Sequence, residues 1–175
     1  MGDLLVITGA PGAGKLRVAA NLVSARGGPV VYLAAAHWSD PAETARQAWE
    51  KELGWRDVEE PLDAAGVIRR EGAGGGCIVV DRLSLYTANW MEHADDPDMR
   101  LEDLLAACRE VPADVILITN EVGWDGAPPP TSYTRLHRDV LSQCNQRAAA
   151  AANQVYLTVA GLPLRLKPWT AAGRE

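Results

Sequence analysis

The chain has 175 residues, 47% of them apolar, which is enough for one domain with a hydrophobic core. Its formal net charge of -6 and pI near 5.1 argue against general nucleic-acid binding, because that requires a basic face for the phosphates. No window has the apolar length of a membrane span, and Asp3 interrupts any secretory-signal pattern, so we expect a soluble cytoplasmic protein with a small-molecule partner.

The first motif lies where a short apolar strand, residues 4–7, turns into a helix. Gly9, Gly14 and Lys15 satisfy the spacing G-x-x-x-x-G-K. In such a loop the backbone N–H groups turn around a phosphate, the helix N-terminus adds its positive end, and the lysine neutralises the β/γ oxygens. The sequence therefore predicts a nucleoside triphosphate site. The predicted nucleotide-binding residues are Gly9, Ala10, Pro11, Gly12, Ala13, Gly14, Lys15 and Leu16.

The position after the lysine departs from this motif. A serine or threonine normally stands there, and its hydroxyl holds Mg²⁺. Here the residue is Leu16, which has no side-chain oxygen. We expect phosphate binding to persist and metal-assisted transfer to be weakened.

A second strand follows at the spacing of a βαβ unit. The predicted helix 17–25 ends near Gly27 and Gly28, and residues 30–34 form the next strand. A strand, a helix and a strand within about 30 residues predict a parallel sheet with helices on its faces, which is a three-layer α/β fold. Further along, Asp40 begins a predicted helix that runs to about residue 52.

A third strand ends in a carboxylate. We predict a helix over 62–70, a glycine-rich loop over 72–76 and an apolar strand over 77–80 that ends in Asp81. In a protein with a phosphate loop, this is where a Mg²⁺-organising residue usually sits. Asp81 is therefore the candidate catalytic residue and Mg²⁺ ligand; the alternative is a capping aspartate with no metal role.

The next strand ends in polar residues. Helices predicted over 84–93 and 99–109 precede it, with a turn and helix cap at 95–98. The strand over 115–119 is followed by Asn120, Glu121, Val122 and Gly123, at the end of a buried strand, where open α/β sheets bind ligands. We assign Glu121 a catalytic role, and Asn120 and Gly123 an acceptor or lid role. The irregular loop 124–130 is a candidate mobile lid.

The remaining elements complete one domain. They are a helix over 133–152, a strand over 155–160 and a last short strand within 161–167. We assign residues 1–167 to a single P-loop nucleotide-binding domain and 168–175 to a C-terminal tail. Cys77, Cys108 and Cys144 are odd in number and widely spaced, so we expect reduced core thiols.

These motifs together resemble the adenosylcobinamide kinase/adenosylcobinamide-phosphate guanylyltransferase family over nearly the whole chain. The residues that carry the resemblance are 9–15, 32–34, 79–81, Leu83, Ser84, Asn89, 119–123, Pro128, Arg135, Arg138, Asp139, Asn145, Gln146, 161–163 and Lys167. The order Asn-Glu-Val-Gly, then Arg-Asp and Asn-Gln, makes the resemblance specific. It implies a RecA-like P-loop fold, usually assembled as a trimer, with Mg²⁺ and with ATP or GTP as cosubstrate. Arg135 and Arg138 join the acceptor or lid residues.

The resemblance implies two reactions. A phosphoryl group passes to the aminopropanol hydroxyl of adenosylcobinamide, and GTP then guanylylates a histidine that hands GMP to this phosphate. Counted from Ala45 and Arg46, the two adjacent histidines of the family fall on Trp49 and Glu50. A carboxylate repels the anionic α-phosphate and is a poorer nucleophile than neutral imidazole. Glu50 thus marks the catalytic position without its chemistry, and His37, the alternative nucleophile, is better explained by a structural role.

Three functions remain open at this point. The first is phosphoryl transfer to a corrinoid, with guanylyl transfer impaired by Glu50. The second is a catalytically degenerate homologue that binds nucleotide without turnover, which Leu16 favours. The third is a related transferase with another small-molecule acceptor.

Overall fold

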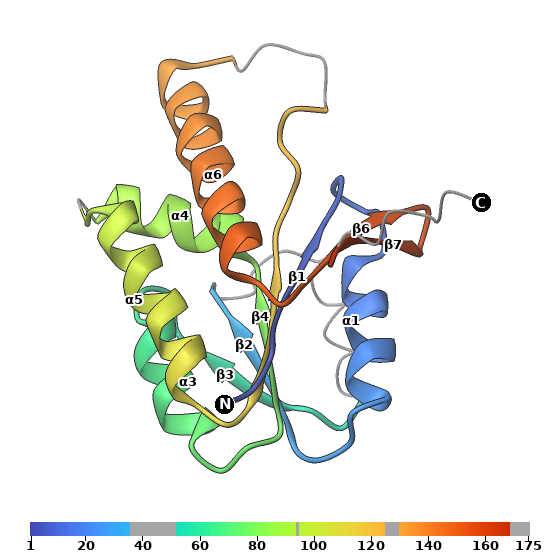
Figure 1. Cartoon of the computed structure of the whole chain (residues 1–175). Coiled ribbons are helices and arrows are strands. Elements are labelled where there is room, and N and C mark those ends of the chain that lie inside the picture. The colour runs from blue at the N-terminus through green and yellow to red at the C-terminus, as the bar shows by residue number, and fades with distance from the viewer. Residues whose placement is uncertain (36–51, 94, 125–129, 169–175) are drawn as a thin grey trace.

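A seven-stranded sheet forms the centre of the computed structural model, which describes residues 1–35, 52–93, 95–124 and 130–168 (Figure 1). The strand order is β3-β2-β4-β5-β1-β6-β7. The strands are β1 (Leu4–Thr8), β2 (Val30–Ala34), β3 (Arg56–Glu59), β4 (Cys77–Asp81), β5 (Asp114–Ile118), β6 (Gln154–Val159) and β7 (Leu162–Lys167). Strands β1 to β6 run parallel, and β7 returns antiparallel to β6. The predicted, mostly parallel sheet is therefore confirmed.

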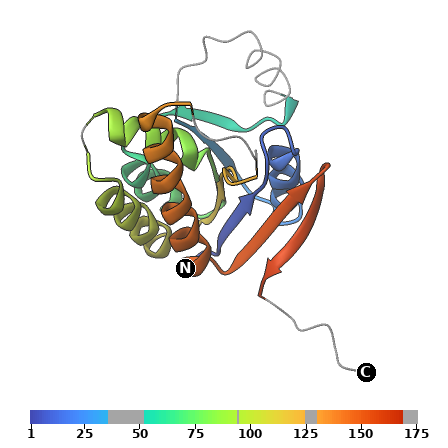
Figure 2. The same ribbon diagram turned by 90° about the horizontal axis from the view of Figure 1, so that it is seen from above.

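Helices cover both faces of this sheet. Those that the structure describes in full are α1 (Lys15–Ser24), α3 (Ala64–Gly72), α4 (Leu83–Glu92), α5 (Pro97–Glu110) and α6 (Ser132–Ala151). Helix α1 packs on one face, and the other four pack on the opposite face (Figure 2). Each face buries its own apolar cluster, because successive strand side chains point to opposite sides. The predicted three-layer α/β fold is confirmed.

Most predicted elements form within two residues of their expected ends. Helix α1 begins earlier than predicted, at Lys15 itself, so the last residues of the phosphate loop are already helical. Asp96 caps α5 and accepts a hydrogen bond from the Asp98 backbone N–H, as the predicted turn requires. The predicted helix from Asp40, the centre of the lid loop at 125–129, and residues 169–175 lie outside the described residues.

One strand, β3, has no counterpart in the sequence prediction. Its sequence is Arg-Asp-Val-Glu, and only Val58 packs against the core. The strand exists because it pairs with β2, Val31 opposite Arg56 and Ala34 opposite Glu59, at the edge of the sheet. An edge strand with exposed charged residues has no hydrophobic pattern from which it could be predicted.

The cysteines and the helices provide two further observations. Cys77, Cys108 and Cys144 are buried and form no disulfide, as predicted. None of the described helices is both long enough and apolar enough to span a membrane.

Candidate active site

The phosphate loop connects β1 to α1 at the carboxyl edge of the sheet, and two of its glycines are required by geometry. A Cβ on Gly9 would lie 2.5 Å from the Thr158 carbonyl oxygen, and Gly14 caps α1 in the left-handed region at φ 90°. The turn between β6 and β7 supports the loop, because the Gly161 N–H donates to the Ala13 carbonyl at 2.8 Å. The loop therefore packs against β6 and the β6–β7 turn, which restrict its conformation.

Lys15 is 8% exposed, and its ammonium lies inside the loop. Its Nζ donates to the carbonyl oxygens of Gly9 at 3.0 Å and Ala10 at 2.8 Å. These bonds hold the cation at the phosphate loop, which is where the β/γ oxygens of a triphosphate would bind.

The carboxylate of Asp81 lies at the end of β4, which β5 separates from β1 in the sheet, and the residue is 1% exposed. Tyr32, on the neighbouring strand β2, donates its hydroxyl to Asp81 Oδ2 at 2.6 Å. A short hydrogen bond of this kind fixes the orientation of the carboxyl group. Asp81 does not cap the following helix, because the N-cap of α4 is Arg82.

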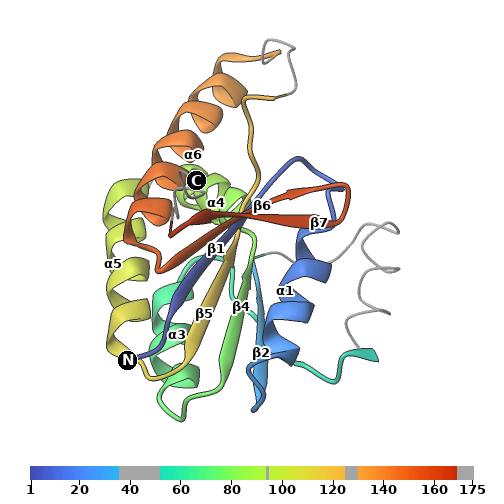
Figure 3. The same cartoon turned by 45° about the vertical axis from the view of Figure 1, so that its right-hand side comes forward.

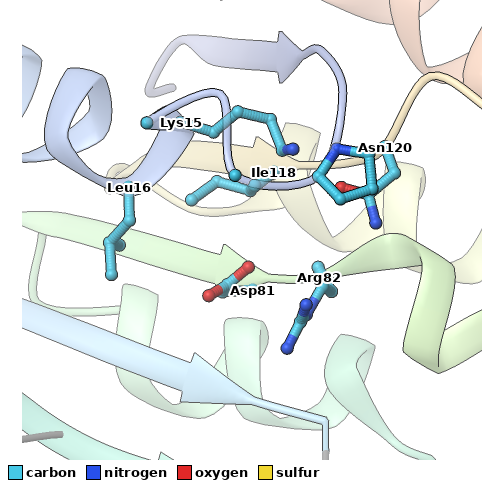
Figure 4. Close-up of a pocket in the computed structure, with 9 residues that line it drawn as sticks. Lys15, Leu16, Asp81, Arg82, Ile118 and Asn120 are labelled. Atoms are coloured by element: carbon cyan, nitrogen blue, oxygen red, sulfur yellow. The ribbon is translucent and has the colours of Figure 1, made fainter. Parts of the chain in front are cut away.

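These residues line one cavity of about 290 Å³ (Figure 4). Its lining residues are Pro11, Gly12, Gly14, Lys15, Leu16, Asp81, Arg82, Ile118 and Asn120. Figure 4 shows Lys15 and Leu16 coming from α1 and Asp81 and Arg82 coming from the end of β4, around the same space. One carboxylate and two cationic side chains therefore surround a space bounded by the phosphate loop.

Asn120 is held at the rim of this cavity by hydrogen bonds from two helices. Its side-chain Nδ2 donates to Ser84 Oγ at 3.4 Å, and its backbone carbonyl accepts from Asn145 Nδ2 at 2.9 Å. Asn145 Oδ1 in turn accepts from the Thr119 hydroxyl at 2.6 Å. Asn145, the first residue of the Asn-Gln pair on α6, thus fixes the end of β5.

A second cavity, of about 320 Å³, lies on the other side of this strand end. It is lined by Val6, Thr8, Thr119, Glu121, Ser142, Asn145, Gln146, Ala149, Val155 and Leu166. The chain beyond β5 continues its pairing with β1, with the Thr119 N–H bound to the Ile7 carbonyl and the Glu121 N–H to the Gly9 carbonyl. In this extended chain Asn120 lines the first cavity, and Thr119 and Glu121 line the second.

A model of one protein family matches residues 5–166, and its description is cobinamide kinase/cobinamide phosphate guanyltransferase. The chain belongs to this family. The bifunctional adenosylcobalamin biosynthesis protein CobP of Pseudomonas aeruginosa is 36% identical over 169 residues, covering 93% of this chain and 96% of its own. The bifunctional protein CobU of Salmonella typhimurium is 30% identical over 184 residues, covering 94% and 99%. The resemblance inferred from the motifs is confirmed.

The crystal structure of a KaiC-like protein from Pyrococcus horikoshii supports the fold. It matches with a TM-score of 0.55 at 18% identity, and covers 89% of this chain and 72% of that one. At this identity the match concerns the fold alone, and it agrees with the predicted RecA-like P-loop architecture.

Against this cobinamide kinase family background, the structure brings together some of the predicted site residues. Pro11, Gly12, Gly14, Lys15, Leu16, Asp81 and Asn120 meet at the first cavity. Gly9 and Ala10 hold the lysine, and Ala13 binds the β6–β7 turn without lining the cavity. Glu121 lies in the second cavity, whereas Gly123, Arg135 and Arg138 line neither one. Glu50 lies outside the described residues.

Two site residues were not anticipated from the sequence. Tyr32 reads as one apolar position of a buried strand, and only the pairing of β2 with β4 brings its hydroxyl to Asp81. Arg82 directly follows Asp81 in the sequence and lines the same cavity. This adjacency to a predicted site residue could have indicated it.

His137 connects two helices through hydrogen bonds. Its Nε2 lies 3.0 Å from the Ser84 carbonyl and 3.0 Å from Thr87 Oγ1, joining α6 to α4. Since a carbonyl only accepts, Nε2 carries the proton when it bonds to Ser84. The ring therefore ties together two helices that support Asn120.

Proposed function

We propose that this protein transfers a phosphoryl group from ATP or GTP to adenosylcobinamide, as a step of cobalamin nucleotide-loop assembly. The observation that carries the proposal is the cavity in which the P-loop lysine, Lys15, and the buried carboxylate of Asp81 meet. Membership of the cobinamide kinase family over residues 5–166 supports the identity of the acceptor.

The proposed reaction is an in-line displacement at the γ-phosphorus. The acceptor hydroxyl oxygen forms the new P–O bond, the bond to the β–γ bridging oxygen breaks, and the nucleoside diphosphate leaves while the hydroxyl proton is released. Such transfers depend mainly on positioning and on charge stabilisation. Lys15 and the loop N–H groups would hold the β/γ oxygens, and Arg82 adds a second positive charge to the cavity.

The cavity fits a Mg²⁺ ion held largely by the nucleotide. Mg²⁺ at such sites takes one or two carboxylates together with phosphate oxygens and water. Asp81 would be the protein ligand, with its orientation fixed by Tyr32, whereas Leu16 contributes no oxygen. When bound, the ion supplies neutralisation of the charge that develops on the phosphate oxygens.

Leu16 favours a second candidate function, a nucleotide-binding homologue without turnover. This side chain lines the cavity where the usual hydroxyl would approach the metal. For the guanylyl step we propose loss or strong impairment, because Glu50 stands at the family histidine position. Under the main proposal, the phosphorylated acceptor is therefore the released product.

We further propose that the protein is cytoplasmic and that it forms a homotrimer, the assembly that the family resemblance implies. The surface that supports self-association is an aliphatic face on β6 and β7, where Val159, Leu162, Leu164 and Leu166 are 52%, 72%, 59% and 42% exposed. Val159 pairs with Leu162 and Leu157 with Leu164, so these side chains share one face of the ribbon. Exposed apolar patches of this kind mark protein interfaces. Sedimentation analysis would test the assembly.

The function is tested by incubating the protein with Mg²⁺ and labelled ATP or GTP, with and without adenosylcobinamide. Labelled phosphate on the acceptor supports kinase activity, and acid-labile label on the protein would reveal a guanylylated intermediate. Tight nucleotide binding with no labelled product would instead support the nucleotide-binding homologue. Hydrolysis that ignores the corrinoid would point to another acceptor.

The substitution Leu16→Ser sharpens the test of the metal site. A hydroxyl at this position adds a Mg²⁺ ligand, so we expect a several-fold faster Mg²⁺-dependent transfer and a lower Mg²⁺ concentration at half-maximal rate. The matched control is Leu16→Ala, which removes the same side chain without adding an oxygen. An unchanged rate in both variants would show that other groups hold the metal.

A further inference from the structure

The second cavity has a polar lining that the proposed phosphoryl transfer leaves unused. It lies on the sheet face opposite α1, between β1, β6 and α6. Apolar walls from Val6, Val155 and Ala149 surround the polar side chains of Thr8, Glu121, Ser142 and Gln146. Figure 3 shows α6 beside β1 and β6, the elements that form these walls.

Much of the hydrogen-bonding capacity in this lining is unmet. Thr8 Oγ1 is buried and has no hydrogen-bond partner among the described residues. Among the described residues, the side chains of Glu121, Ser142 and Gln146 also make no hydrogen bond. By contrast, the amide of Asn145 is used at both ends, by Thr119 and by the Asn120 carbonyl. Buried polar atoms normally find partners, so a ligand in the cavity is the natural partner of Thr8 Oγ1. The half-buried Glu121 and Ser142 and the exposed Gln146 are open to the same ligand.

The chemistry of these groups selects a primary carboxamide. The Glu121 carboxylate accepts from an amide NH₂, the hydroxyls of Ser142 and Thr8 donate to an amide oxygen, and Gln146 can do both. The apolar walls suit the methylene groups that carry such an amide. No lysine or arginine lines the cavity among the described residues, and the Glu121 charge repels anions, so a phosphate does not fit.

The position of the cavity connects it to the transfer site. Only the chain at 118–121 separates the two, with Asn120 lining one cavity and Thr119 and Glu121 lining the other. A large acceptor whose hydroxyl reaches the phosphate loop extends past this strand end. Cobinamides carry several primary carboxamide arms around the corrin ring.

We propose that the second cavity binds a carboxamide arm of the corrinoid acceptor, with Glu121 and Gln146 as its principal hydrogen-bonding groups. This inference rests on the proposed function. It gives Glu121 an acceptor-binding role in place of the catalytic role expected from the sequence, and it makes α6 a determinant of acceptor specificity.

The test measures binding of dicyanocobinamide, followed by its visible absorbance, to the wild-type protein and to the variants Gln146→Leu and Glu121→Leu. Loss of one hydrogen bond to the ligand is expected to raise the dissociation constant about tenfold in each variant. The affinity for ATP is expected to stay unchanged. The matched control is Gln143→Leu, the same replacement at an exposed α6 position that does not line the cavity.

A second probe tests the amide chemistry itself. The corrinoid cobyrinic acid heptamethyl ester replaces the amides by esters, which cannot donate hydrogen bonds, so the wild-type protein is expected to bind it at least tenfold more weakly than dicyanocobinamide. Both cavity variants are expected to lose most of this discrimination. Equal cobinamide binding by wild type and variants would overturn the inference alone. Wild-type protein that binds nucleotide but no corrinoid would overturn the proposed function as well.

Discussion

The two cavities at the carboxyl edge of the sheet differ in how the chain builds them. The first takes most of its lining from the contiguous segment 11–16, which is the loop after β1 and the start of α1, completed by the ends of β4 and β5. The second is assembled from β1, the end of β5, α6, β6 and β7, which are scattered along the chain. Anion binding follows from local backbone geometry, whereas recognition of a large acceptor requires groups that only packing brings together.

The largest expected effect comes from removing the lysine of the phosphate loop, Lys15, from the first cavity. The substitution Lys15→Ala is expected to lower the rate of phosphoryl transfer about 10²- to 10³-fold, because a fixed charge at the developing phosphate is lost. Steady-state kinetics with saturating corrinoid measures the effect. Arg17→Ala, an exposed position of the same helix, controls for the loss of one positive charge. If the two cavities have separate roles, the Lys15→Ala variant still binds the corrinoid although it has lost phosphoryl transfer.

Next comes the link between the two cavities, which Asn145 provides. Asn145→Leu removes the acceptor of the Thr119 hydroxyl and the donor to the Asn120 carbonyl, leaving both without this partner. We expect the free energy of unfolding to fall by about 2 kcal/mol, as measured by urea denaturation. Both nucleotide and corrinoid binding should weaken. Asn21→Leu on the exposed face of α1 is the control, and similar losses in the two variants would contradict the linking role.

A smaller effect is expected from Tyr32→Phe, which acts on the first cavity alone, through Asp81. The change removes the 2.6 Å hydrogen bond to Asp81 and keeps the ring that packs near Trp55. We expect a loss of about 1.5 kcal/mol in the free energy of unfolding and a higher Mg²⁺ requirement, with corrinoid affinity unchanged. Tyr156→Phe, which removes a half-buried bond to Gln154, should change stability less and leave the Mg²⁺ requirement as it is. A Mg²⁺ requirement that Tyr32→Phe does not alter would refute the positioning of Asp81.

The smallest effect at neutral pH concerns two buried core thiols, which line neither cavity. Burial raises the pKa of Cys77 and of Cys108 to about 12, compared with roughly 8.5 for an unperturbed thiol. Above pH 9 the unfolded chain loses these protons while the folded chain keeps them, so stability falls as the pH rises towards 12. Below about pH 7 the two thiols contribute almost no pH dependence, because both states keep the protons. Urea denaturation between pH 7 and 10.5 measures this fall, and Cys108→Ala should reduce it; a flat profile would contradict the burial of the thiolate-forming groups.

The sequence predicted the first cavity more completely than the second for a physical reason. Gly9, Gly14 and Lys15 act through the conformation of adjacent residues, so their spacing is enough to recognise the loop. Asp81 could be placed because a parallel sheet brings strand ends to one edge. Glu121 was placed at the right strand end, but the sequence did not show which face of the sheet its side chain would occupy.

By itself, the sequence determined the family, the three-layer fold, the phosphate loop and the reduced, buried state of the three cysteines. These features are encoded by local spacing and by apolar runs long enough to define strands and helices. Only the tertiary structure decided that β3 pairs at the edge, that Tyr32 holds Asp81, and that Asn145 fixes the strand end between the two cavities. Those contacts join residues at least 25 positions apart, and their geometry depends on strand register and helix packing, which no local pattern specifies.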